Sequence, residues 1–155
     1  MKKSITWIIA CFILGSAAIA QDKENDEKEI KNVIQSAYID GIQNSGEIED
    51  IEEGFHPGFN LLIYKGNMMD KLPIYNWIEY VKMRKAKMAE TDPPVEKTTV
   101  EFIDIDITGT AAVAKIKLFK GGEHIFTDYL SLYNFTDDGW KIVGKIYYQI
   151  PKEEK

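Results

Sequence analysis

The stretch 124–135 carries an acidic residue where its alternation otherwise places apolar side chains. Phe126, Asp128, Leu130 and Leu132 share one face of this expected strand, and we assign that face to the interior. Burial away from water raises the pKa of a carboxyl group, so Asp128 is predicted to remain protonated in a pocket. The alternative is an aspartate near the rim, either solvated or paired with a backbone amide or a nearby lysine. We expect Asp128→Asn to change ligand affinity more than stability.

The last strand-like run, 140–150, supplies a second wall for this pocket. Two sets of side chains alternate along it, Trp140, Ile142 and Ile146 on one face and Lys141, Val143 and Lys145 on the other. We assign the first set to the interior because this choice leaves the lysines in water.

His56 is the candidate base. A neutral imidazole near pH 7 accepts a proton, and it pairs well with Asp128 if the two side chains meet. The alternative is a histidine that caps or packs at a helix-to-strand corner before Pro57. His124 is expected to be exposed, and the two histidines lack metal-site spacing. The only cysteine, Cys11, lies in a segment expected to be removed, so no metal and no cofactor is predicted.

Four large side chains are candidates for the mouth of the pocket: Tyr64, Met68, Met69 and Trp77. As a set they suit a flat, apolar or aromatic ligand. Trp77 also falls in the apolar stripe of an expected helix, so ordinary core packing is the alternative for it.

The N-terminal half must supply helices to position these groups. Asp26 and Glu29 are typical of a capping pair, and apolar residues at steps of three and four predict a long helix up to Ile42. A short second helix is expected over 47–53. The segment 55–59 interrupts the helical pattern.

The remaining elements follow from turn signals. A small hairpin is predicted over 60–64 and 68–72, and Pro73 suits the first turn of a helix that must stop before Asp92. Four strand-like runs then follow, at 95–107, 110–119, 124–135 and 140–150. Because short turns with glycine separate them, they predict an antiparallel meander. Helices first and strands afterwards indicate the α+β class.

The N-terminus is typical of a secretory signal. Lys2 and Lys3 precede the apolar run 5–14, and Ala18 and Ala20 form a cleavage site before Gln21. We therefore expect a signal peptide over 1–20, one domain over 21–151, a tail over 152–155, no retained membrane span, and a periplasmic or secreted protein. The alternative is a lipoprotein cleaved before Cys11. Removing Lys2 and Lys3 from the 19 basic residues changes the formal charge from −6 to −8, which argues against a nucleic-acid partner.

Four stretches of sequence resemble one superfamily. The segments 38–41 and 55–59, and above all 127–132 followed by 139–145, are similar to nuclear transport factor 2-like proteins of the putative lumazine-binding family. The resemblance implies a cone-like fold, in which helices pack on a curved, mainly antiparallel sheet that encloses a pocket. Together with the expected signal peptide and the large side chains at the mouth, this pocket predicts an exported protein that binds a small apolar or aromatic ligand.

The resemblance includes steroid isomerases, which leaves an enzyme as the alternative. Their tyrosine and protonated aspartate loosely match Tyr38 and Asp128, but no carboxylate stands in 60–64, where their base is expected. The alternative is thus an isomerase, lyase or dehydratase using Asp128, Tyr38 and His56. For a binding protein, the candidate ligand-binding residues are Tyr38, His56, Tyr64, Trp77, Asp128 and Leu130.

The outer face of the last two strands is also expected to be apolar, through Tyr129, Tyr133, Phe135, Val143 and Tyr147. Helices cover only one face of such a sheet. An uncovered aromatic strip predicts a partner surface, and the resemblance makes a sheet-to-sheet homodimer the expected one. The alternative is a monomer in which the tyrosine hydroxyls and nearby lysines keep this aromatic strip solvated.

Overall fold

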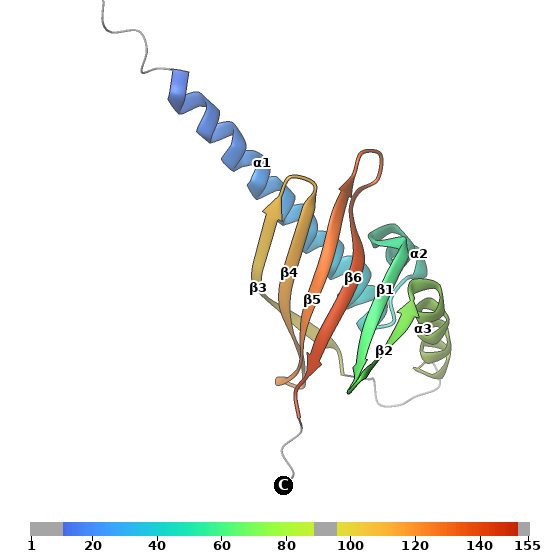
Figure 1. Ribbon diagram of the computed structural model, residues 1–155. Coiled ribbons are helices and arrows are strands. Elements are labelled where there is room, and N and C mark those ends of the chain that lie inside the picture. Colours follow the sequence, from blue (N-terminus) through green and yellow to red (C-terminus); the bar gives the residue numbers. More distant parts are fainter. Residues whose placement is uncertain (1–10, 89–95, 152–155) are drawn as a thin grey trace, which may run out of the picture.

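The computed structural model describes residues 11–88 and 96–151, with side chains from residue 22 onward (Figure 1). Its helices all lie before residue 89, ahead of the four-strand meander, as the sequence predicts. They are α1 (Cys11–Val33), η1 (Ile34–Gln43), α2 (Ile48–Gly54) and α3 (Ile74–Met88). No helix among the described residues is long and apolar enough to cross a membrane.

Six strands form a single curved sheet. They are β1 (Phe55–Lys65), β2 (Met68–Pro73), β3 (Thr98–Thr108), β4 (Ala111–Lys120), β5 (Glu123–Phe135) and β6 (Gly139–Gln149). Their order across the sheet is β2-β1-β6-β5-β4-β3. The meander β3–β6 is antiparallel as predicted, and its turns contain Gly109 and Gly139 at positive φ, a conformation that glycine adopts without a steric penalty.

The segment 55–59 interrupts the helical pattern as predicted, and it forms the beginning of strand β1. Phe55 pairs in parallel with Ile142 of β6, and the pairing resumes at Asn60 with Gly144 after an irregularity. The irregularity absorbs Pro57, which has no N–H to offer a neighbouring strand. The hairpin of β1 and β2 was predicted correctly, whereas its first strand is longer than expected.

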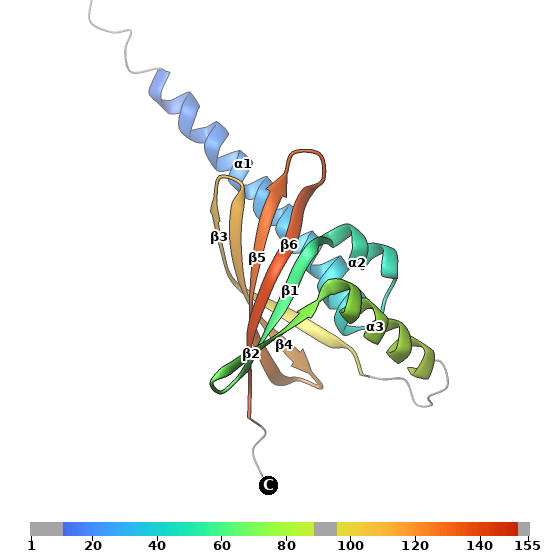
Figure 2. The same ribbon diagram turned by 45° about the vertical axis from the view of Figure 1, so that its right-hand side comes forward.

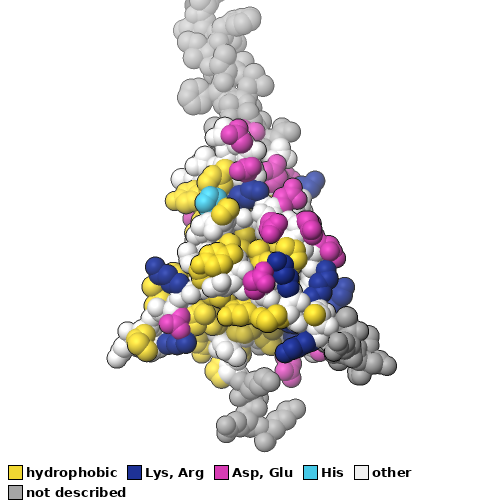
Figure 3. All heavy atoms as spheres, turned by 90° about the vertical axis from the view of Figure 1, so that its right-hand side faces the viewer, with side chains coloured by type: hydrophobic (Ala, Val, Ile, Leu, Met, Phe, Trp, Pro, Cys, Tyr) yellow, Lys and Arg dark blue, Asp and Glu magenta, His cyan; other side chains and the backbone are white. Residues whose placement is uncertain are grey.

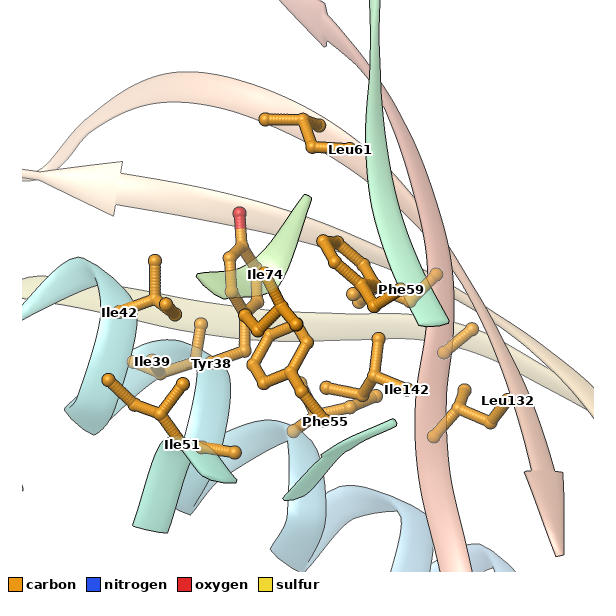
Figure 4. Packing of buried hydrophobic residues seen from close by; sticks show 14 of the residues in the cluster. Tyr38, Ile39, Ile42, Ile51, Phe55, Phe59, Leu61, Ile74, Leu132 and Ile142 are labelled. Carbon is orange, nitrogen blue, oxygen red and sulfur yellow. The ribbon is translucent and has the colours of Figure 1, made fainter. Parts of the chain in front are cut away.

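The helices lie together on one side of the sheet, and both ribbon views show α1 crossing behind β3–β6 (Figures 1 and 2). The core fills the space between these two layers. Figure 4 shows Phe55 and Phe59 from β1 meeting Ile142 from β6, Leu132 from β5 and Tyr38 from η1. The Phe55 and Phe59 rings are edge to face with centroids 4.8 Å apart. Aromatic pairs of this kind stabilise a core beyond the area that they bury.

Close backbone approach holds α2 against η1. A Cβ added at Gly54 would lie only 2.2 Å from the Cβ of Ala37, so this contact requires glycine. The predicted capping role of Asp26 is wrong, because the helix begins at Cys11 and Asp26 lies inside it. The Asp26 carboxylate instead accepts a hydrogen bond from Trp140 Nε1 at 3.0 Å, which joins α1 to β6.

Candidate functional site

A tyrosine and an aspartate from opposite layers meet in the interior. Tyr38 lies on η1 and Asp128 on β5, and both side chains are fully buried. The Tyr38 hydroxyl donates a hydrogen bond to Asp128 Oδ2 at 2.5 Å. In Figure 4 this hydroxyl stands at the end of the ring that points away from Ile51. The inward direction of Asp128 and Leu130 follows the alternation of β5.

The third member of the cluster is Lys145, which the sequence analysis placed on the opposite face. Ser131 pairs with Gly144 but Leu132 pairs with Ile142, so Val143 is an extra residue in β6. Such a bulge moves every following side chain to the other face of the sheet. Lys145 therefore points inward and is 6% exposed, while Ile146 is 52% exposed. The predicted faces of these two residues were wrong.

Lys145 completes an ion pair inside the protein. Its Nζ lies 3.0 Å from Asp128 Oδ1, in a direction that does not make a hydrogen bond, so Oδ1 accepts none from the described residues. The ammonium also lies over two aromatic rings, 4.5 Å from the centroid of Tyr147 and 5.4 Å from that of Tyr38. The charge is thus surrounded by one carboxylate and two ring faces, which attract cations.

Burial shifts two of these groups in opposite directions. It raises the pKa of Tyr38 well above the ordinary value, and the nearby Asp128 charge raises it further. Burial lowers the pKa of Lys145, and this outweighs the opposite effect of Asp128. Tyr38 therefore keeps its proton and directs it to the carboxylate.

The π-helical geometry of η1 places a fourth side chain on the cluster. Hydrogen bonds in a π-helix join residues five apart, as in the bond from Asn44 N–H to the Ile39 carbonyl. Gln43 follows Tyr38 by five residues, and its Nε2 donates to the Tyr38 hydroxyl at 2.9 Å. In an α-helix the facing neighbours are three and four residues apart. Single π-turns are frequent at functional sites, and this segment contains ten residues.

A cavity of about 260 Å³ opens next to this cluster, at the end of η1. Its apolar wall comes from Met88, Ile125 and Phe126, and its polar wall includes Gln43. Two contacts join it to the cluster. Gln43 bonds to Tyr38, and the Phe126 ring meets the Tyr147 ring edge to face at 5.5 Å. None of the site residues predicted from the sequence lines this cavity itself.

His56 does not belong to this arrangement. Its ring stacks on Phe135 with centroids 4.8 Å apart, and its Nδ1 accepts the Gly58 N–H at 3.0 Å. Phe135 follows Asp128 by seven residues on the same strand and faces the other way, which places it about 23 Å along the strand. The hypothesis that His56 pairs with Asp128 is therefore contradicted. His56 packs at the start of β1, as the alternative interpretation predicted.

The expected mouth residues are also dispersed. Tyr64 is 81% exposed near the end of the β1–β2 hairpin, and Met68 and Met69 are exposed beside it. Trp77 packs on the core, with its ring stacked on Phe59 at a centroid distance of 6.0 Å. The core-packing alternative applies to Trp77. In the part of the chain that the structure describes, no group of three or more histidine, cysteine or acidic side chains is placed to hold a metal ion.

The comparisons with known proteins show one family, from a family model, and one fold, from solved structures. The putative lumazine-binding family matches residues 25–148. A nuclear transport factor 2-like protein of unknown function from Shewanella baltica is 23% identical, with a TM-score of 0.63 over 83% of this chain and 96% of its own. A similar protein from Methylobacillus flagellatus is also 23% identical, with a TM-score of 0.60 over 82% and 94%. At these identities the likeness shows the fold alone. A comparison with curated proteins finds no significant match.

Proposed function

Since the chain belongs to the putative lumazine-binding family and has the nuclear transport factor 2-like fold, we propose that it binds a small aromatic or apolar molecule in the cavity beside Gln43. The observation that carries this proposal is the double role of Gln43. This side chain lines the cavity and donates to Tyr38, so a ligand there contacts the edge of the buried polar cluster. Apolar walls with a few polar groups are typical of small-molecule sites.

The same contacts favour binding over proton abstraction. A structure described as a putative ketosteroid isomerase, from Shewanella frigidimarina, is 15% identical, with a TM-score of 0.50 over 77% of this chain and 94% of its own. Isomerases of this type need hydrogen-bond donors aimed at a substrate oxygen. Here the Tyr38 hydroxyl is aimed at Asp128, and Lys145 balances the carboxylate charge. The Tyr38 hydroxyl and the Lys145 ammonium are thus directed at Asp128 and not at an incoming substrate.

Binding is tested with 2-naphthamide as a neutral aromatic probe. We expect amide resonances of Gln43, Ile125 and Phe126 to shift in ¹⁵N–¹H spectra. Ile125→Trp fills the cavity and is expected to abolish these shifts, whereas Ile103→Trp, on an exposed position of β3, is the matched control. Unchanged cavity resonances at saturating probe, with shifts confined to other surfaces, contradict the proposal.

We propose in addition that the outer sheet face joins two copies of the chain. Its exposed apolar side chains differ from those expected, because the β6 bulge turns Tyr147 inward and Ile146 outward. The strip consists of Val113, Tyr129, Tyr133, Ile146 and Tyr148. Figure 3 faces the side of the molecule that lies at the right in Figure 1, and it shows hydrophobic side chains grouped there between acidic and basic ones. Light scattering at micromolar concentration tests this assembly, since a monomeric mass for the unmodified chain contradicts it.

Export is the third proposal and rests on the sequence. Cleavage after Ala20 leaves Gln21 as the first residue and keeps Asp26, whose carboxylate anchors α1 to Trp140. Intact mass measurement of the protein produced in a secreting host tests the cleavage site. A lipid-modified Cys11 contradicts it.

A further inference from the structure

The cavity beside Gln43 has an unusual charge for this protein. Three basic residues, Arg84, Lys97 and Lys120, line it together with a single acidic one, Glu96. The whole chain carries a formal charge of −6. A locally positive cavity in an acidic protein attracts anions while the remaining surface repels them.

Arg84 is the best placed of these cations. Its Nε donates to Ser45 Oγ at 2.7 Å, and its Nη2 donates to the Ile42 carbonyl. Both acceptors are neutral, and no carboxylate of the described residues forms an ion pair with Arg84. Burial alone lowers the pKa of its guanidinium, with no acidic neighbour to oppose the effect. A guanidinium has five N–H donors, so some stay available after these two bonds.

The apolar wall limits what else the ligand can be. Met88, Ile125 and Phe126 offer hydrocarbon and one aromatic face, and the volume of about 260 Å³ suits a small ring system. The carboxamide of Asn44 is occupied, because it donates to the Thr98 carbonyl and accepts the Thr98 N–H. The free polar groups of the cavity are therefore mainly cationic.

Building on the binding function proposed above, we propose that the ligand is an aromatic anion, with its carboxylate or similar group at Arg84, Lys97 and Lys120 and its ring against Ile125 and Phe126. A planar acid group accepts two parallel hydrogen bonds from a guanidinium, which a neutral amide does not.

The test compares 2-naphthoate with 2-naphthamide, which match in shape and differ in charge. We expect the full-length protein to bind the anion about fivefold more tightly, as two or three partly exposed charge contacts allow. Raising the salt concentration is expected to weaken naphthoate binding and to leave naphthamide binding unchanged. Equal affinities with no salt dependence overturn the anionic preference and leave the binding function standing. If neither probe shifts the cavity resonances, both proposals fail.

Charge variants locate the effect. Lys97→Gln with Lys120→Gln is expected to remove most of the preference for naphthoate, while naphthamide binding stays the same. Lys28→Gln with Lys71→Gln removes the same charge from exposed positions outside the cavity lining and is the control. Arg84→Lys keeps the charge but loses the planar fork, so it is expected to weaken naphthoate binding. An equal loss in the control pair means that overall charge explains the preference, which overturns the proposal.

Discussion

The ion pair between Asp128 and Lys145 is the most sensitive point of the interior. Asp128→Asn leaves the Lys145 ammonium without its counter-charge at a position that is 6% exposed. Removing one partner of a buried pair costs about 3–5 kcal/mol, a large share of the roughly 5–15 kcal/mol that stabilises a domain. The tyrosine rings around the ammonium reduce this cost, so we expect about 3 kcal/mol. Replacing both partners, as Asp128→Asn with Lys145→Met, is expected to recover most of the loss, since no unpaired charge remains.

Urea unfolding followed by tryptophan fluorescence measures the four free energies of this double-mutant cycle. Lys65→Met and Asp70→Asn, at an exposed ion pair, form the matched control and are expected to leave the unfolding midpoint unchanged. Additive losses at Asp128 and Lys145, or single losses no larger than those of the control pair, refute the reasoning. The sequence alone predicts that Asp128→Asn affects ligand affinity more than stability, whereas the ion pair predicts a loss of stability, and this cycle measures that loss.

Three further predictions follow from individual side chains. Tyr38 is expected to keep its proton above the pH at which exposed tyrosines ionise, because its folded pKa is raised. The stability that protonated Tyr38 contributes is complete below the unfolded pKa of about 10, and it is lost as the pH rises through the folded pKa. In a titration followed by absorbance at 295 nm, the unmodified protein is expected to show a late ionisation step that accompanies unfolding, and Tyr38→Phe is expected to lack that step. Gly54→Ala is expected to destabilise the fold by about 1–3 kcal/mol in thermal unfolding, because its Cβ collides with Ala37, and an unchanged melting temperature argues against the tight contact. Tyr133→Glu is expected to convert a dimer to a monomer in light scattering, and an unchanged dimeric mass excludes the outer sheet face as the interface.

Local patterns predicted most of the fold. Apolar alternation and glycine turns located β3 to β6, and three- and four-residue steps located the helices, because these signals arise within short segments. The parallel contact of β1 with β6 was not predicted, since it joins segments far apart in the chain. Its position depends on packing across the whole sheet.

The site was predicted only in part, because sequence patterns report on short segments. Alternation placed Asp128 inside correctly, but the same reasoning failed at Lys145 because one extra residue in β6 reverses the faces beyond it. Gly144 was the available signal, as a glycine inside a strand often marks a bulge. Gln43 had no comparable signal, because its contact with Tyr38 requires a π-helix and helical patterns are read with α-helical spacing.

The parallel pairing of β1 with β6 also constrains the order of folding. Leu61 is paired with Lys145, whereas each strand from β3 to β6 pairs with its neighbour in sequence. Closing a short loop costs less entropy than closing a long one, and contacts between distant segments form more slowly. The meander is therefore expected to assemble first. The β1–β2 hairpin then has an edge to join only when β6 is in place. A chain emerging from a ribosome or a membrane channel with its N-terminus first thus cannot complete the sheet until β6 is free.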